Sequence, residues 1–272
     1  MKFIFTFLFL LPSLMQGFSQ TTREIRKSIE LKMPAGNGEN GGTVAVSLKN
    51  RNLYATIVGN KTYSLAFFNG AGEMASPPDL ALLADVRGLW YNPALKTFQG
   101  NLFGTGGWVT YIMDDAGIPY DVKPAFAGQL QPGANSVAVF NQRENAVHYL
   151  KGNTVVTYDI ASGKQVIEKT YALKIGFTKK NPAPADYKAD TAKTAANYNI
   201  TTVIYTGITN AEFGLLNLAT REIELYSKND GLLYQKLKLP AEVQLKDKFN
   251  FAFANNTYFI FDRMKRTWVG YR

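Results

Sequence analysis

Apolar and polar residues alternate along this chain in short runs, and the runs are separated by turns rich in Gly, Asn and Asp. Alternation with a period of two is typical of strands that bury one face. The runs recur in units of three or four predicted strands, with no convincing amphipathic helix of ordinary length among them. The first strands of successive units begin near Thr43, Gly88, Ser136, Thr202 and Phe249.

These starts are 45, 48, 66 and 47 residues apart. The long interval contains residues 174–198, which are polar, rich in Ala and Lys, and without strand alternation. We expect them to form an inserted surface loop, extended at first, with a short helix near residues 187–195. Without this insertion the period lies in the forties throughout, which is typical of the blades of a β-propeller or of a related repeat array.

The two ends of the chain complement each other. The last unit has only three strands, within residues 249–271, while an unmatched strand pattern occupies residues 25–33. If that N-terminal strand is the outer strand of the last unit, the ring closes and hides its edges. The pattern therefore predicts an all-β fold over residues 20–272, a five-bladed β-propeller closed by pairing of the N-terminal strand with the C-terminal blade. A β-sandwich or a more open array is the structural alternative, which the period and the complementary ends disfavour.

The repeats over residues 43–272 resemble β-propellers in general. The signatures of particular propeller families, such as recurring Trp-Asp dipeptides, kelch di-glycines or Asp-box turns, do not recur. The resemblance therefore implies a fold and assigns no functional residues.

Residues 1–19 predict a secretory signal peptide. Lys2 precedes an apolar run over residues 3–11, and Gly17 and Ser19 supply the small residues that a cleavage site needs. The run is too short for a stop-transfer helix, and no later run approaches that length. We therefore expect a secreted or periplasmic protein with no transmembrane segment after signal removal. A buried N-terminal strand or helix is the alternative.

Composition limits the chemistry. The chain has no Cys, which excludes disulfides and thiolate metal sites, and His148 is its only His. We therefore expect neither a metal nor a cofactor, and a packing role for His148 between neighbouring sheets. The net charge of +9 favours anionic partners such as polysaccharides, envelope lipids or acidic proteins, although solubility alone also explains it. An exported protein is not expected to bind nucleic acid, and we expect a monomer.

Three acidic residues, Asp85, Asp247 and Glu39, lie just ahead of predicted inner strands. In a five-bladed ring they would gather at one mouth of the central channel. Glycan hydrolysis uses two carboxyl groups that face each other across the substrate, so these residues are the candidates for catalysis. An ordinary role in turns is the competing explanation.

Aromatic residues are the stronger candidates for ligand binding: Trp90, Tyr91, Trp108, Tyr111 and Trp268. Exposed aromatic rings stack on sugars and dominate many interfaces. Packing between blades is the competing role for each of them. Trp90 and Tyr91 are adjacent in a strand and point to opposite faces, so we expect one of the two to leave the local layer.

Together these features favour an exported, non-catalytic binding or scaffolding propeller that recognises a glycan or a protein partner. Loops at one mouth and the basic insertion would form its contact surface. The insertion owes its charge to Lys174, Lys179, Lys180, Lys188 and Lys193. The alternative is a glycan-cleaving hydrolase with carboxylates at the channel mouth.

Overall fold

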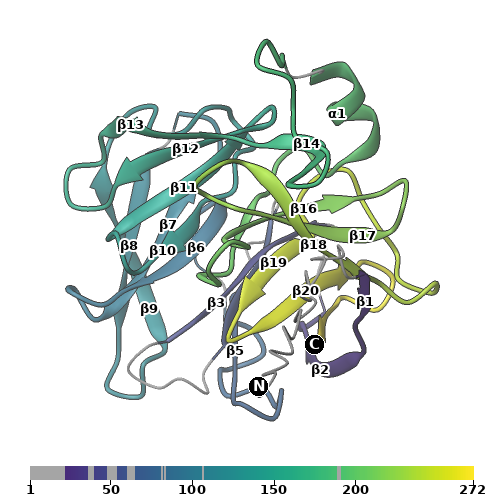
Figure 1. The fold of residues 1–272 in the computed structure, drawn as a ribbon. Helices are drawn as coiled ribbons and strands as arrows, with labels where there is room; N and C mark the ends of the chain where they lie inside the picture. Colours follow the sequence, from purple (N-terminus) through teal and green to yellow (C-terminus); the bar gives the residue numbers. More distant parts are fainter. Residues whose placement is uncertain are drawn as a thin grey trace, which may run out of the picture.

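The structure is a computed structural model, and the part of the chain that it describes comprises residues 22–35, 40–47, 54–59, 65–80, 82, 84–105, 107–188 and 191–272. The predicted signal peptide and Glu39 lie outside the described residues. Within the described part, the strands form five sheets, and one short helix lies beside them (Figure 1).

The five sheets follow the five predicted units, and their successive strands are antiparallel. The first sheet contains β3 (Asn40–Val46), β4 (Tyr54–Gly59) and β5 (Leu65–Phe68). The second contains β6 (Val86–Asn92), β7 (Thr97–Leu102), β8 (Trp108–Met113) and β9 (Pro119–Phe126). The third contains β10 (Val139–Asn141), β11 (Ala146–Lys151), β12 (Thr154–Asp159) and β13 (Gln165–Ala172). The fourth contains β15 (Ile204–Tyr205), β16 (Phe213–Asn217), β17 (Glu222–Tyr226) and β18 (Leu232–Lys238). The fifth contains β19 (Phe251–Ala254), β20 (Thr257–Asp262), β21 (Thr267–Tyr271) and the N-terminal β2 (Lys27–Lys32).

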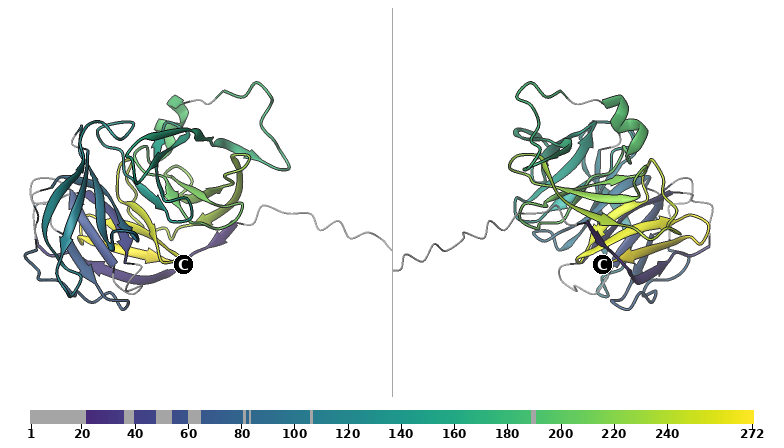
Figure 2. Two further views of the ribbon diagram at one scale, coloured as in Figure 1. Left: turned by 90° about the vertical axis from the view of Figure 1, so that its left-hand side faces the viewer. Right: turned by 45° about the vertical axis from the view of Figure 1, so that its right-hand side comes forward.

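The first strands of the sheets lie around a common axis. β3 contacts β6, β6 contacts β10, β10 contacts β15, β15 contacts β19, and β19 returns to β3. Two further views show the sheets arranged around this axis (Figure 2). The protein is therefore a five-bladed β-propeller, and the fold predicted from the strand period is confirmed.

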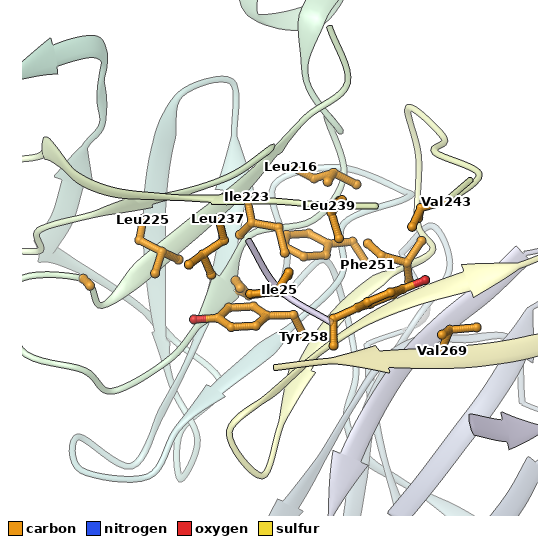
Figure 3. Close-up of a cluster of buried hydrophobic side chains, with 14 residues drawn as sticks. Ile25, Leu216, Ile223, Leu225, Leu237, Leu239, Val243, Phe251, Tyr258 and Val269 are labelled. Carbon is orange, nitrogen blue, oxygen red and sulfur yellow. The ribbon is translucent and has the colours of Figure 1, made fainter. Parts of the chain in front are cut away.

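The N-terminal segment belongs to two blades rather than one. β2 is the fourth strand of the last sheet, where Lys32 pairs with Thr267 of β21. The shorter β1 (Thr22–Glu24) runs parallel to β18 of the fourth sheet. Ile25, between them, is buried among apolar side chains of both sheets (Figure 3). The strand expected over residues 25–33 thus pairs with the C-terminal blade as predicted, while β1, which precedes it and joins the neighbouring blade, was not expected.

The insertion is only partly the loop that the sequence predicts. Its first residues form β14 (Lys174–Thr178), which is parallel to β18, and its helix α1 (Thr191–Asn197) begins later than expected. β14 and β1 pair one after the other with the outer edge of β18, near Leu232 and Lys236 respectively. An unpaired strand edge exposes backbone donors and acceptors, so this pairing protects the edge.

Asn side chains join neighbouring blades near the start of the inner strands. The buried Asn101 Oδ1 accepts hydrogen bonds from the backbone N–H of Gly88 at 2.9 Å and of Ala138 at 3.1 Å. Asn250 Oδ1 accepts a hydrogen bond from Gly41 N at 2.7 Å, which links the fifth sheet to the first. These contacts satisfy buried backbone donors within or beside the inner strands.

Candidate binding site at the channel mouth

A cavity of about 440 Å³ lies on the propeller axis and is lined by residues of all five inner strands or the turns after them. It lies toward the end of the molecule at which the inner strands finish. Its rim includes Phe253 of β19 and side chains from three turns, namely Gln142, Arg143, Ile208, Asn255 and Asn256. The site is therefore assembled from segments far apart in the sequence.

The wall of the cavity follows from how an inner strand packs. β6 pairs only with β7 among the described strands, so its other edge faces the axis. Tyr91 packs with residues of the first two sheets, while Trp90 packs with residues of the second and third. Because the side chains point toward the neighbouring blades, the strand presents backbone N–H and C=O groups to the channel.

Behind the wall, His148 is held by a buried polar network. Its Nε2 accepts a hydrogen bond from Asn141 Nδ2 at 3.1 Å, and its Nδ1 donates to Thr157 Oγ1 at 2.9 Å. Thr157 Oγ1 donates in turn to the carbonyl oxygen of Lys169, which fixes this assignment of the imidazole proton. Burial, together with the charge of Lys169, lowers the pKa of His148 to about 3. His148 is therefore neutral at physiological pH.

Tyr205 connects this network to the cavity. Its ring centroid lies 5.5 Å from that of His148, and the residue also lines the cavity. Burial raises the pKa of Tyr205, and the nearby positive charge of Arg143 opposes that rise. Arg143 is exposed and forms no ion pair with any described residue. The rim thus offers one cation to a ligand beside an aromatic hydroxyl.

The five aromatic residues predicted to bind a ligand all lie in the cores between blades. Their exposed fractions are small: Trp90 (1%), Tyr91 (6%), Trp108 (0%), Tyr111 (3%) and Trp268 (0%). Trp90 packs edge-on against Trp108, whose Nε1 donates a hydrogen bond to Tyr149 Oη at 3.0 Å. Burial raises the pKa of Tyr111, and Trp268 packs against Phe261. In this arrangement none of the five rings presents its face to solvent.

The adjacent pair Trp90 and Tyr91 does point to opposite faces of β6, as a strand requires. The further expectation that one of them leaves the local layer is wrong. A propeller blade has a neighbouring blade on each side, so both faces of β6 are covered, and all seven of its residues are buried. Both residues also line the channel cavity.

Asp85 and Asp247 lie at the other end of the inner strands. Both carboxylate oxygens of Asp85 accept hydrogen bonds from the Arg87 guanidinium, one of them at 3.0 Å from Nη2. Arg87 is 7% exposed, and its guanidinium carbon lies 4.7 Å from the Phe103 ring centroid and 5.5 Å from that of Phe249. Asp247 is exposed, two residues before Phe249. Asp85 therefore forms an ion pair with Arg87.

The rim residues were not predicted from the sequence. Gln142, Arg143, Asn255 and Asn256 occupy turns that follow inner strands, and turn residues carry no periodicity. Their position in the repeat could have identified them, because the turns after the inner strands of a propeller all lie at the same mouth of its channel. Polar residues directly after the predicted inner strands could have been grouped on that basis.

No family model matches the chain, and no curated protein is similar to it. Among the described residues, no three His, Asp or Glu side chains are grouped as a metal site would require. The described helix is also too short to cross a membrane. Functional inference therefore depends on the geometry of the propeller itself.

Proposed function

We propose that this protein is an exported, non-catalytic binding propeller that holds a glycan or protein partner at the rim of the channel cavity. The observation that carries this proposal is the convergence of all five blades on one concavity of about 440 Å³. Cavities of roughly 300–1,000 Å³ with a few convergent polar groups are typical ligand sites. A signal peptide at residues 1–19 would deliver the protein to the periplasm or the exterior.

The chemistry of the rim supports a polar ligand with acidic groups. Arg143 supplies a positive charge, and the amides of Gln142, Asn255 and Asn256 can both donate and accept hydrogen bonds. Ile208, which is 46% exposed, adds apolar surface beside them. Such a mixture suits an acidic glycan or an acidic protein loop, since a few anchor contacts supply most of the binding energy.

Glycan cleavage has less support as a function. It requires one carboxylic acid that donates a proton and a second carboxylate facing it. Asp85 is engaged through both oxygens by the buried Arg87. This ion pair accounts for Asp85 without a catalytic role.

The test compares the wild-type protein with Arg143→Glu and with a matched control, Lys123→Glu. Lys123 is exposed on the outer strand β9, so the control makes the same change of charge away from the rim. Both variants and the wild type are applied to an array of defined glycans and to immobilised exported proteins of the source organism. We expect to find a ligand whose affinity falls at least tenfold with Arg143→Glu and stays unchanged with Lys123→Glu. Equal binding by all three proteins, or no ligand in either screen, would contradict the proposal.

A further inference from the structure

The insertion builds a second cavity, of about 400 Å³, against the fourth blade. Six of the residues that line it are Phe177, Tyr187, Lys188, Asn197, Tyr198 and Asn217. β16 runs antiparallel to the inner strand β15, and Asn217 is its last residue. The cavity therefore lies toward the face opposite the channel rim. In Figure 2 the green segment between β14 and α1 projects from the body of the propeller.

An aromatic pair forms one wall of this insertion cavity. The ring centroids of Phe177 and Tyr187 lie 5.1 Å apart at an interplanar angle of 73°, an edge-to-face arrangement. Both residues are partly exposed, unlike the five aromatics buried between blades. Each ring holds the other in place, so a ligand would meet a preformed apolar surface.

The same segment concentrates positive charge. Residues 174–188 contain four lysines and one acidic residue, Asp186. None of these lysines forms an ion pair with a described residue, and Lys188 lines the cavity. Unpaired cations around a concavity attract anionic ligands and favour their retention.

Another part of the cavity lining is polar and hydrogen-bonded. Tyr198 Oη donates a hydrogen bond to Glu224 Oε2 at 2.8 Å, and Asn217 Nδ2 donates to Oε1 at 3.1 Å. Glu224 is 3% exposed, and Lys236 lies 3.5 Å from its Oε1. Because these partners compensate the buried carboxylate, the exposed lysines dominate the field that a ligand meets.

We propose that the insertion cavity binds an acidic sugar residue of the hexuronate type within an anionic polysaccharide. The C–H face of the sugar ring would lie against Phe177 and Tyr187, because the electron-rich faces of aromatic rings attract partly positive C–H groups. The sugar carboxylate would pair with Lys188. An acidic peptide would use the lysines without needing the aromatic pair, so the pair favours a sugar. This site is separate from the channel rim.

The test uses the whole chain and calorimetric titration with oligomers of galacturonate, mannuronate or glucuronate, alongside a neutral galactose oligomer and poly-glutamate. We expect at least one uronate oligomer to bind and the neutral oligomer to bind at least tenfold more weakly. Phe177→Ala and Tyr187→Ala should each weaken uronate binding about tenfold, which corresponds to about 1.4 kcal/mol. Lys188→Gln should weaken it severalfold and reduce its salt dependence.

Two control variants separate this site from simpler explanations. Lys180→Gln removes a charge from the same segment outside the cavity lining, and Lys123→Glu changes an exposed charge on the outer strand β9; both should leave uronate affinity within twofold. Thermal unfolding of each variant checks that the fold is retained. The proposal is overturned by no uronate binding, by equal loss in Lys180→Gln and Lys188→Gln, or by poly-glutamate binding that the aromatic variants leave unchanged. If no ligand depends on Arg143 but uronate binding depends on Phe177, Tyr187 and Lys188, the proposed function is refuted and this inference is not.

Discussion

Leu31 of the N-terminal strand lies directly opposite Trp268 of the C-terminal strand, and neither side chain is accessible to solvent. The two residues come from opposite ends of the chain and belong to one apolar cluster between the last blade and the first. The N-terminal strand therefore contributes to the core as well as completing a sheet. Its loss would uncover both the edge of β21 and the side chains packed beneath it.

Leu31→Ala should lower the free energy of unfolding by about 2–5 kcal/mol, the usual cost of a cavity in a well-packed core. The neighbouring exposed residue provides the control, because Lys32→Ala removes a side chain from the same strand without creating a cavity. Its effect should stay within about 0.5 kcal/mol. Urea unfolding of both variants checks this, and equal effects would show that Leu31 is not packed as described.

His148 should make stability depend on pH. The unfolded chain takes up a proton on this residue near pH 6.5, whereas the folded chain resists protonation until about pH 3. Between these values the unfolded state binds more protons, so stability falls as the pH falls, by about 1.4 kcal/mol per unit from this residue. In His148→Gln the dependence between pH 6 and pH 4 should be shallower by about that slope. Parallel curves for the two proteins would refute the buried, neutral state.

Gly88 allows two blades to approach closely. A Cβ on this residue would lie 2.3 Å from the backbone nitrogen of Ala138 and 2.5 Å from Asn101 Oδ1. Gly88→Ala should therefore cost about 2 kcal/mol or more, because backbone must shift at a blade junction. Gly133→Ala is the matched control, since its Cβ would meet only Ser136 Oγ at 3.7 Å. Thermal unfolding should separate the two variants clearly, and similar midpoints would argue against the tight junction.

Asp85 and Asp247 should behave differently when neutralised. Asp85→Asn leaves the buried Arg87 without its carboxylate and should cost about 2–4 kcal/mol of stability. Asp247 is exposed, so Asp247→Asn should change stability by less than about 0.5 kcal/mol. Chemical denaturation measures both. A glycan-cleaving activity in the wild type that both variants abolish would instead favour the hydrolase alternative.

The strand period was enough to predict the propeller, because a blade repeats both its alternation and its turns. It did not predict β1, since the pairing of residues 22–24 with β18 depends on tertiary structure. The strand β14 was missed for a related reason. Its pairing depends on the free edge of β18, which leaves no trace in the local sequence.

The candidate site was less predictable than the fold. Alternation shows that Trp90 and Tyr91 point to opposite faces, but it does not reveal that both faces are covered by neighbouring blades. The rim depends on turns, where residues such as Arg143 and Asn256 meet only through the closure of the ring. Proximity of this kind is a product of tertiary structure, so local patterns could not supply it.

We propose that a partner binds where the five inner strands end. Hydrogen exchange with and without the ligand from the rim screen tests it most directly. Three peptides distant in sequence but joined at the rim, residues 139–143, 205–208 and 253–256, should gain protection together. Protection confined to other segments, with these three unchanged, would contradict the account.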